Sequence, residues 1–307
     1  MYPERARALR SGNRKRNHRH GLSIIFLIFT ISACIPAGET LQPTPFTPDR
    51  TIAPEIPSVD RESGVVPSAP EGDCGGQGST ERYSLESKML NGMLYYTVYF
   101  PPCYARENPD GYPVLYLLHG QNFTDAMWLD LGAAAAADEL ITNGDAAPFL
   151  MVMPYEEYFF RGADDNKFPD ALTAELIPEV EDSFNGCGER ACRALGGISR
   201  GAAWAMRIGL QEWDLFASIG AHSLPTFRGD IDRLPEWLDA IPYGEEPRIW
   251  LDTGRFDPEV KAAYRFAHVF DAKGIPHEWH LKNGRHNEAY WSKNMESYLR
   301  WYAAGWE

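Results

Sequence analysis

A serine lies between two glycines in the segment Gly197-Ile198-Ser199-Arg200-Gly201, which has the spacing of a serine nucleophile held on a sharp turn. An apolar run precedes the segment, and small helix-forming residues follow it. Glycine tolerates the strained backbone that such a turn requires, and the first amide N–H groups of the helix face the same point. The pentapeptide alone is short enough to occur by chance, but this context predicts acyl-transfer chemistry with an anionic intermediate at the helix N-terminus.

A serine hydroxyl is a weak nucleophile at neutral pH, so it needs a nearby base, and the base needs an orienting carboxylate. His286 lies in a loop just beyond the last expected strand and is the predicted general base. Two carboxylates precede it, Asp252 at the end of a strand and Asp257 beyond a glycine turn. We expect Asp257 to be the triad acid, because catalytic carboxylates are usually carried on loops, and we expect it also to be able to cap the helix that follows. Asp252 is the alternative acid, with a turn-stabilising role as the competing expectation.

Two backbone N–H donors are needed where the oxyanion develops. One is predicted to be the amide of Arg200, the residue after the nucleophile, and the other the amide of Gln121, in the loop after His119-Gly120. Asn122, Trp128 and His222 are the candidate residues of the substrate pocket, with the helix core as the competing expectation for Trp128.

Strand and helix signals alternate through the folded part of the chain. Apolar or β-branched runs predict strands at residues 90–100, 113–118, 149–153, 194–198, 216–221, 248–251 and 277–281. Helical patterns cover residues 128–141, 172–184, 202–206, 259–272 and 287–302. This alternation predicts an α/β fold with a mostly parallel central sheet and helices on both faces. Ligands of such sheets bind at the carboxyl ends of the strands, where the candidate catalytic residues are expected.

Four segments in this order resemble the putative esterase family of the α/β-hydrolase superfamily: Val114–Gly120, Gly196–Gly201, Gly254–Asp257 and Gly284–His286, followed by Trp291. That family includes S-formylglutathione hydrolase, feruloyl and acetyl-xylan esterases, enterochelin-type siderophore esterases and mycolyltransferases. The resemblance covers residues 82–301. It implies an α/β-hydrolase fold, a triad of Ser199, Asp257 and His286, and no metal or organic cofactor. This chain departs from the family pattern at Ala202, where a glycine is common, and at Gln121, where many members have Gly or Leu.

The N-terminus predicts export. A basic stretch and a short apolar run, Leu22–Ile31, lead to Ile31-Ser32-Ala33-Cys34, which resembles a bacterial lipoprotein signal. The resemblance implies cleavage before Cys34, lipidation of that cysteine, and an extracytoplasmic protein anchored to a bacterial membrane. An ordinary signal peptide or an uncleaved anchor is the alternative. We therefore divide the chain into a signal (residues 1–33), a Pro-rich tether (residues 34–74) and a catalytic domain (residues 75–307).

The remaining cysteines agree with export, since an even number outside the cytosol suggests disulfides. We expect the pairs Cys187–Cys192 and Cys74–Cys103, and the cysteine and histidine spacings do not fit a zinc site. Without residues 1–33 the chain has 22 basic and 42 acidic residues, a net charge of −20, which argues against a nucleic-acid partner. The sequence carries no signal for a particular oligomeric state.

The predicted function is a serine ester hydrolase that acts through an acyl-enzyme on a small-molecule or polysaccharide ester. Two alternatives remain open at this point. One is an acyltransferase of the same fold, which passes the acyl group to a sugar or lipid hydroxyl instead of water. The other is a binding lipoprotein with a hydrolase fold and no catalysis, which the complete set of catalytic residues argues against.

Overall fold

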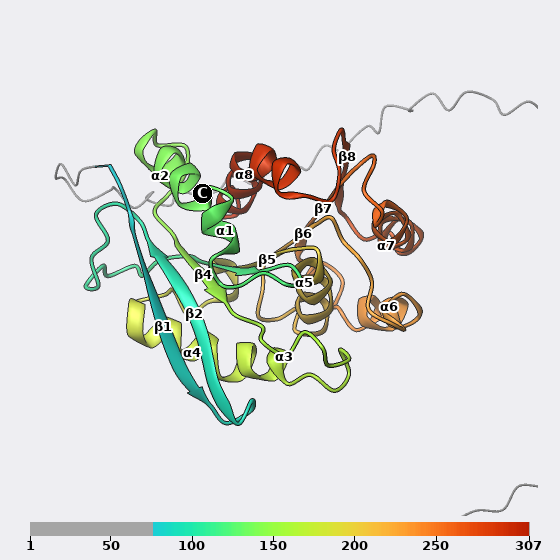
Figure 1. The fold of residues 1–307 in the computed structure, drawn as a ribbon, viewed down its shortest axis with the longest axis horizontal. Helices are drawn as coiled ribbons and strands as arrows, with labels where there is room; N and C mark the ends of the chain where they lie inside the picture. The colour runs from blue at the N-terminus through green and yellow to red at the C-terminus, as the bar shows by residue number, and fades with distance from the viewer. Residues whose placement is uncertain (1–75, 307) are drawn as a thin grey trace, which may run out of the picture. The chain divides into compact units, whose positions relative to one another are not determined.

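One central sheet runs through the described part of the chain, with strand order β1-β2-β4-β3-β5-β6-β7-β8 (Figure 1). The structure is a computed structural model that describes residues 76–306. The strands of this sheet are β1 (Ser79–Ser87), β2 (Gly92–Phe100), β3 (Val114–Leu118), β4 (Leu150–Pro154), β5 (Arg193–Ile198), β6 (Ser218–His222), β7 (Arg248–Gly254) and β8 (Glu278–Lys282). β2 is antiparallel to β1 and β4, and every other neighbouring pair is parallel. The predicted mostly parallel sheet is thus confirmed.

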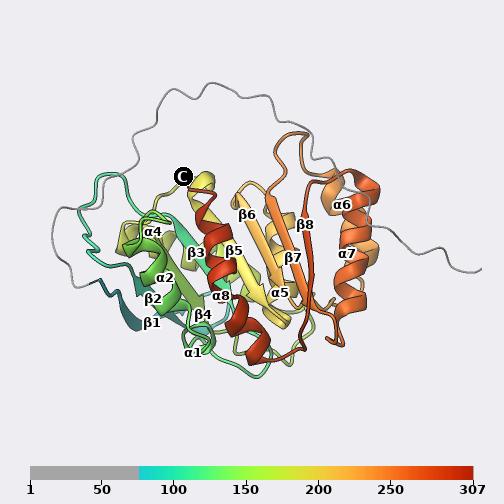
Figure 2. The same cartoon turned by 90° about the horizontal axis from the view of Figure 1, so that it is seen from above.

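Helices cover both faces of this sheet, as predicted. They are α1 (Met127–Asp130), α2 (Ala133–Thr142), α3 (Phe168–Ala171), α4 (Ile177–Phe184), α5 (Arg200–Gln211), α6 (Asp230–Asp239), α7 (Val260–Lys273) and α8 (Glu288–Ala303). A π-helical turn, Leu172–Leu176, joins α3 to α4, and a short 3₁₀ turn, Arg190–Cys192, precedes β5. Figures 1 and 2 show α2 and α8 together on one side of the sheet, with α4 and α5 on the other.

The core has two layers because successive side chains of a strand point to opposite faces. On β3, Val114 and Tyr116 pack into the layer under α3 to α7, whereas Leu115 and Leu117 pack into the layer under α1, α2 and α8. β3, β4 and β5 are buried along their whole length, which explains why their sequences are apolar on both faces. These central strands therefore give the rigid base on which the loops at their carboxyl ends are mounted.

Several elements differ from the sequence expectation. The predicted helix at residues 128–141 is divided into α1 and α2 at Gly132, whose φ of 94° lies in the left-handed region that favours glycine. The predicted helix at residues 172–184 begins instead with the π-helical turn. β1 and α6 were not predicted; β1 has a polar sequence with mostly exposed side chains, which is typical of a strand at the edge of a sheet.

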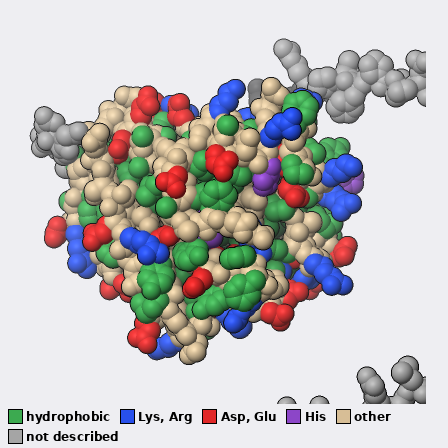
Figure 3. Space-filling view, viewed as in Figure 1, with side chains coloured by type: hydrophobic (Ala, Val, Ile, Leu, Met, Phe, Trp, Pro, Cys, Tyr) green, Lys and Arg blue, Asp and Glu red, His purple; other side chains and the backbone are tan. Residues whose placement is uncertain are grey.

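The predicted signal and tether, including Cys34 and Cys74, lie outside the described residues. The predicted bond between Cys187 and Cys192 is present, and Cys103 is also disulfide-bonded. Within residues 76–306, no helix combines the length and apolar character needed to cross a bilayer. The same part of the chain contains no group of three or more His, Cys, Asp or Glu side chains placed to hold a metal ion. Figure 3 shows acidic and basic side chains intermixed over one face of the molecule.

Candidate active site

Ser199 lies on the turn between β5 and α5, with φ 55° and ψ −123°. A residue with a side chain rarely adopts a positive φ, so this backbone is strained, as expected of a nucleophile elbow. The flanking glycines make the strain possible. A Cβ atom at Gly197 would lie 2.1 Å from the carbonyl carbon of Gly201, and one at Gly201 would lie 2.1 Å from the Leu118 oxygen. Both positions therefore exclude any side chain.

The structure brings His286 to Ser199, the predicted nucleophile. The loop between β8 and α8 carries this histidine, and its Nε2 atom lies 2.8 Å from Ser199 Oγ. The next residue, Asn287, caps α8 by accepting a hydrogen bond from the Tyr290 amide at 3.2 Å, so the position of the imidazole is tied to the start of a long helix. The side chain of His286 is 23% exposed, which leaves the base open to solvent.

Asp257 orients the imidazole. Its two carboxylate oxygens both lie 3.0 Å from His286 Nδ1, and the side chain is buried. A negative carboxylate can only accept here, so Nδ1 carries the proton and Nε2 is free to accept from the serine hydroxyl. Burial alone would raise the pKa of Asp257, but hydrogen bonds from His286, the Glu259 amide and Ser223 outweigh burial and lower that pKa below 3.8. The carboxylate therefore stays charged at neutral pH.

Sequence reasoning missed Ser223. This residue directly follows β6, is fully buried and has φ 55°. Its hydroxyl hydrogen-bonds Asp257 and accepts from Trp291 Nε1 at 3.0 Å. The Trp291 ring in turn lies edge-on to His286, with ring centroids 5.2 Å apart. Trp291 thus supports Asp257 through Ser223 and packs against His286. No local motif around Ser223 predicts these contacts.

Asp252, the alternative acid, hydrogen-bonds a different histidine, His222. It is fully buried, and its oxygens accept from His222 Nδ1 at 2.6 Å, Trp250 Nε1 at 3.1 Å, Tyr290 at 2.6 Å and Tyr298 at 2.8 Å. Four donors occupy the acceptor sites of this carboxylate, so it cannot also accept a hydrogen bond that would orient His286. Asp252 ties the sheet to α8, which is a larger structural role than the turn stabilisation expected from sequence.

Two of the three candidate pocket residues need correction. Trp128 and His222 are fully buried, so they do not line an open pocket. The Trp128 indole donates to the Leu118 oxygen at 3.2 Å, and the His222 imidazole stacks on Tyr298 with centroids 3.7 Å apart. Both side chains therefore belong to the core, because their polar atoms are already satisfied there. Asn122 is exposed in the loop after β3, with φ 68°.

The two predicted oxyanion donors lie in segments that meet at the nucleophile. Arg200 is the first residue of α5, so its amide is among those that have no acceptor within the helix. The loop that carries Gln121 is close by, because a Cβ atom at Gly120 would lie 3.5 Å from Ser199 Cβ. An oxyanion formed on a carbonyl attacked by Ser199 would therefore develop beside both segments.

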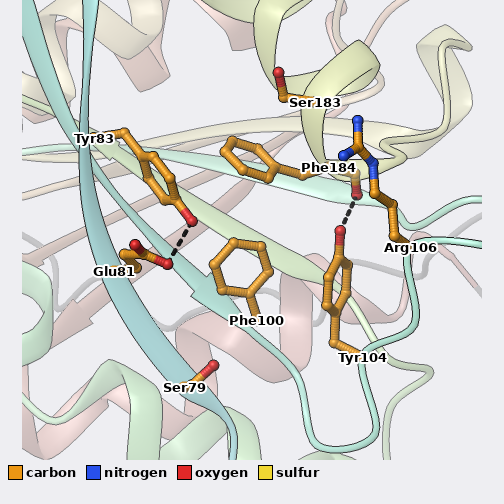
Figure 4. A pocket seen from close by; sticks show the side chains of 8 residues that line it. All are labelled: Ser79, Glu81, Tyr83, Phe100, Tyr104, Arg106, Ser183 and Phe184. Atoms are coloured by element: carbon orange, nitrogen blue, oxygen red, sulfur yellow. Dashed lines mark hydrogen bonds between the residues drawn. The ribbon is translucent and has the colours of Figure 1, made fainter.

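A separate shallow cavity of about 330 Å³ lies away from these residues, between β1, the end of β2 and α4 (Figure 4). Aromatic rings form most of its wall: Tyr83, Phe100, Tyr104 and Phe184. The hydroxyls of Tyr83 and Tyr104 are engaged by Glu81 and the Phe184 carbonyl, respectively. The cavity contributes no side chain to the cluster around Ser199.

The chain is similar in sequence to known esterases. The sequence pattern of the family described as "Putative esterase" matches residues 87–302. An endo-1,4-beta-xylanase/feruloyl esterase of Xylanibacter ruminicola is 29% identical over 177 residues, which are 54% of this chain and 24% of that protein. The chain thus spans about a quarter of that relative's length.

Solved structures share the fold. A ferulic acid esterase has a TM-score of 0.67 at 22% identity, with 75% of this chain and 99% of that chain covered. S-formylglutathione hydrolase from Staphylococcus aureus has a TM-score of 0.58 at 16% identity, with 73% and 98% covered. The family match extends over most of the described residues, and the sheet order, the elbow and these structural neighbours agree with it. This chain belongs to the putative esterase family and has the α/β-hydrolase fold.

Proposed function

We propose that the protein is a serine ester hydrolase that works through an acyl-enzyme on Ser199. The observation that carries this proposal is the chain of contacts from Ser199 Oγ to His286 Nε2 at 2.8 Å and from His286 Nδ1 to Asp257 at 3.0 Å, on a strained elbow. Contacts of this length let the imidazole take the serine proton as the oxygen attacks.

The reaction divides into two halves. Ser199 Oγ bonds to the ester carbonyl carbon while its proton passes to His286 Nε2, and the carbonyl oxygen becomes an anion beside the Arg200 and Gln121 amides. The C–O bond to the alcohol then breaks as the imidazolium donates its proton to the leaving oxygen. Water repeats these steps on the acyl-enzyme and releases the acid. Asp257 stays ionised throughout and stabilises the imidazolium.

We propose that water is the acceptor of the acyl group. The His286 side chain is 23% exposed, so water can reach the imidazole that must activate it. We propose that the substrates are esters of plant polysaccharides, with feruloyl esters the first to test. This choice is supported by the Xylanibacter relative, a xylanase/feruloyl esterase, and by the ferulic acid esterase structure.

The same proposal places the enzyme outside the cytoplasm, anchored through Cys34. Its support is the basic, apolar and Cys-terminated N-terminal segment. The Cys187–Cys192 disulfide agrees with this, since such bonds persist in oxidising compartments.

The test is a Ser199→Ala variant assayed on p-nitrophenyl butyrate and methyl ferulate. We expect kcat to fall by about 10⁴ or more with the fold intact, because the nucleophile is lost. Ser292→Ala is the matched control, since Ser292 is exposed on α8 and is expected to leave activity unchanged. Full turnover by the Ser199→Ala variant, or an inactive wild-type enzyme across acetyl, butyryl and feruloyl esters, would refute the proposal.

A further inference from the structure

The two peptides that flank Gly120 are both held by hydrogen bonds. The Gly120 oxygen accepts a hydrogen bond from His119 Nδ1 at 2.8 Å, and the Gly120 amide donates to the sulfur of Met127 at 3.1 Å. In a trans peptide the C=O of one residue and the N–H of the next point in opposite directions. The Phe123 amide also donates to the Gly120 oxygen, at 3.1 Å, so His119 and this turn together set the direction of the Gln121 N–H, which is the predicted first donor of the oxyanion hole.

His119 itself is held by Glu156. The Glu156 amide donates to His119 Nε2 at 2.9 Å, so that nitrogen must be unprotonated and Nδ1 must carry the hydrogen. The imidazole is buried, with 5% exposure, and has one tautomer that satisfies both contacts. Glu156 follows β4 by two residues, so the contact joins the loop after β3 to the loop after β4.

The side chain of Glu156 holds the second donor segment. Its carboxylate accepts from Arg200 Nε at 2.6 Å and Nη2 at 2.9 Å, a bidentate pair. The pair is nearly dry, with side-chain exposures of 11% for Arg200 and 4% for Glu156. Asn166 donates to the same carboxylate at 2.7 Å, and the guanidinium packs over the rings of Trp204 and Phe227. Arg200, the first residue of α5, is thereby held in place through its side chain.

We propose that Glu156 is a positioning residue that sets the geometry of the oxyanion hole. Its amide orients the Gln121 N–H through His119, and its carboxylate orients the Arg200 N–H through the guanidinium. The two donor segments lie far apart in the sequence, and Glu156 contacts both. This inference rests on the serine-hydrolase function proposed above and assigns a role to the arginine that follows the nucleophile.

The first experiment compares Glu156→Gln with Glu157→Gln. The first change removes the charge that holds Arg200, whereas Glu157 is exposed and serves as the matched control. Loss of one oxyanion donor costs about 10²- to 10³-fold in rate, so a displaced donor is expected to lower kcat by about 10- to 100-fold. KM is expected to change by less than about twofold, because the donors act on the transition state.

A second measurement separates positioning from folding. Fluorophosphonate labelling forms a Ser199 Oγ–P bond and expels fluoride, and the phosphonyl oxygen occupies the oxyanion position. We expect Glu156→Gln to slow this labelling by about the same factor as kcat, at a temperature well below its unfolding midpoint. A variant that unfolds earlier yet keeps wild-type kcat and labelling rate when folded would overturn the inference.

Arg200→Lys supplies an independent variant. Lysine keeps the charge but cannot form the bidentate pair, so it is expected to lower kcat as Glu156→Gln does. The double variant should be no slower than the slower single variant, since both changes break one contact. Additive losses would refute the coupling.

The outcomes for the proposed function and for this inference can be told apart. If the wild-type enzyme is labelled but hydrolyses no ester, the proposed function fails, while the labelling rate still tests Glu156. If the wild-type enzyme hydrolyses esters and Glu156→Gln does so at the same rate, only this inference fails.

Discussion

At the scale of single residues, we expect Asp257 to serve catalysis and Asp252 to serve the stability of the fold. Asp257→Asn should lower kcat by about 10⁴ with little change in the unfolding midpoint, because the wrong imidazole tautomer is then favoured. Asp252→Asn should instead destabilise the fold by about 3 kcal/mol, because it breaks a buried pair with His222. Ester hydrolysis and urea unfolding of both variants provide the check. A stable but inactive Asp252→Asn enzyme would reverse the assignment.

The stability that Asp252 provides should depend on pH in a definite direction. Burial alone would raise the pKa of Asp252, but His222 and the tyrosine hydroxyls outweigh burial and hold that pKa below 3.8. A carboxylate with a lowered folded pKa stabilises the fold above its unfolded pKa, and the gain is lost as pH falls through the folded pKa. The difference in unfolding free energy between wild type and Asp252→Asn should therefore be constant from pH 8 to about 5 and shrink below about pH 4. A difference that grows on acidification would contradict this.

Ser223 offers a third test at this scale, because its hydroxyl links Trp291 to Asp257. Both Ser223→Gly and Ser223→Ala remove the hydroxyl, but glycine also accommodates the φ of 55° without strain. We expect both variants to lose about 3- to 10-fold in kcat, which corresponds to about 1 kcal/mol for one lost hydrogen bond. Both variants should also lose stability, because the buried Trp291 Nε1 loses its acceptor, and glycine should lose less because it relieves the strain that serine and alanine share at this φ. Wild-type kcat in the glycine variant would show that the hydroxyl does not act on Asp257.

At the scale of elements, the elbow depends on how closely α5 approaches β3. A Cβ atom at Gly201 would lie 2.1 Å from the Leu118 oxygen, a backbone atom of a buried strand that cannot turn aside. Gly201→Ala should therefore destabilise the protein by about 3 kcal/mol or more and abolish hydrolysis. Gly162→Ala is the control, since a Cβ atom there meets only the end of the Asp165 side chain at 3.8 Å. Thermal unfolding of both proteins distinguishes the two positions.

The elements also show how far the sequence could predict this molecule. Apolar runs located the central strands, and the order of Ser199, Asp257 and His286 along the chain named the residues that the fold brings together. β1 was not predicted because this edge strand carries polar side chains. The break at Gly132 was not predicted because a single glycine within an alanine-rich run is compatible with one continuous helix. Their positions in the sequence made Trp128 and His222 pocket candidates, with the helix core as the competing expectation for Trp128, and their packing partners place both in the core.

The contacts that support the site were beyond sequence reasoning for a different reason. Glu156 meets His119 and Arg200, which are 37 and 44 residues away, and Ser223 meets Trp291, which is 68 residues away. Each contact joins segments that follow different strands, so it depends on the order of strands in the sheet. Sequence order does not reveal that β3 lies between β4 and β5, and this arrangement puts the loops that carry Glu156 and Arg200 on either side of His119.

At the scale of the whole molecule, the proposed membrane attachment and the proposed catalysis should be separable. In the intact chain, Cys34→Ser should release the protein from the membrane fraction, since the acyl chains would have no attachment site. Its kcat on p-nitrophenyl butyrate should match wild type, because the catalytic residues lie in residues 76–306. Cell fractionation and palmitate labelling give the readout. Membrane retention of the Cys34→Ser protein without label would favour an uncleaved anchor instead.

The direct succession of His286, the Asn287 cap and α8 has a consequence for biosynthesis. A ribosome makes the nucleophile long before the base, and the helix that fixes the base is formed by the closing residues of the described chain. A nascent polypeptide with the elbow already folded therefore holds a serine without a proton acceptor. On the proposed mechanism, hydrolysis needs His286 in place, so a nascent chain that ends before α8 is not expected to hydrolyse esters.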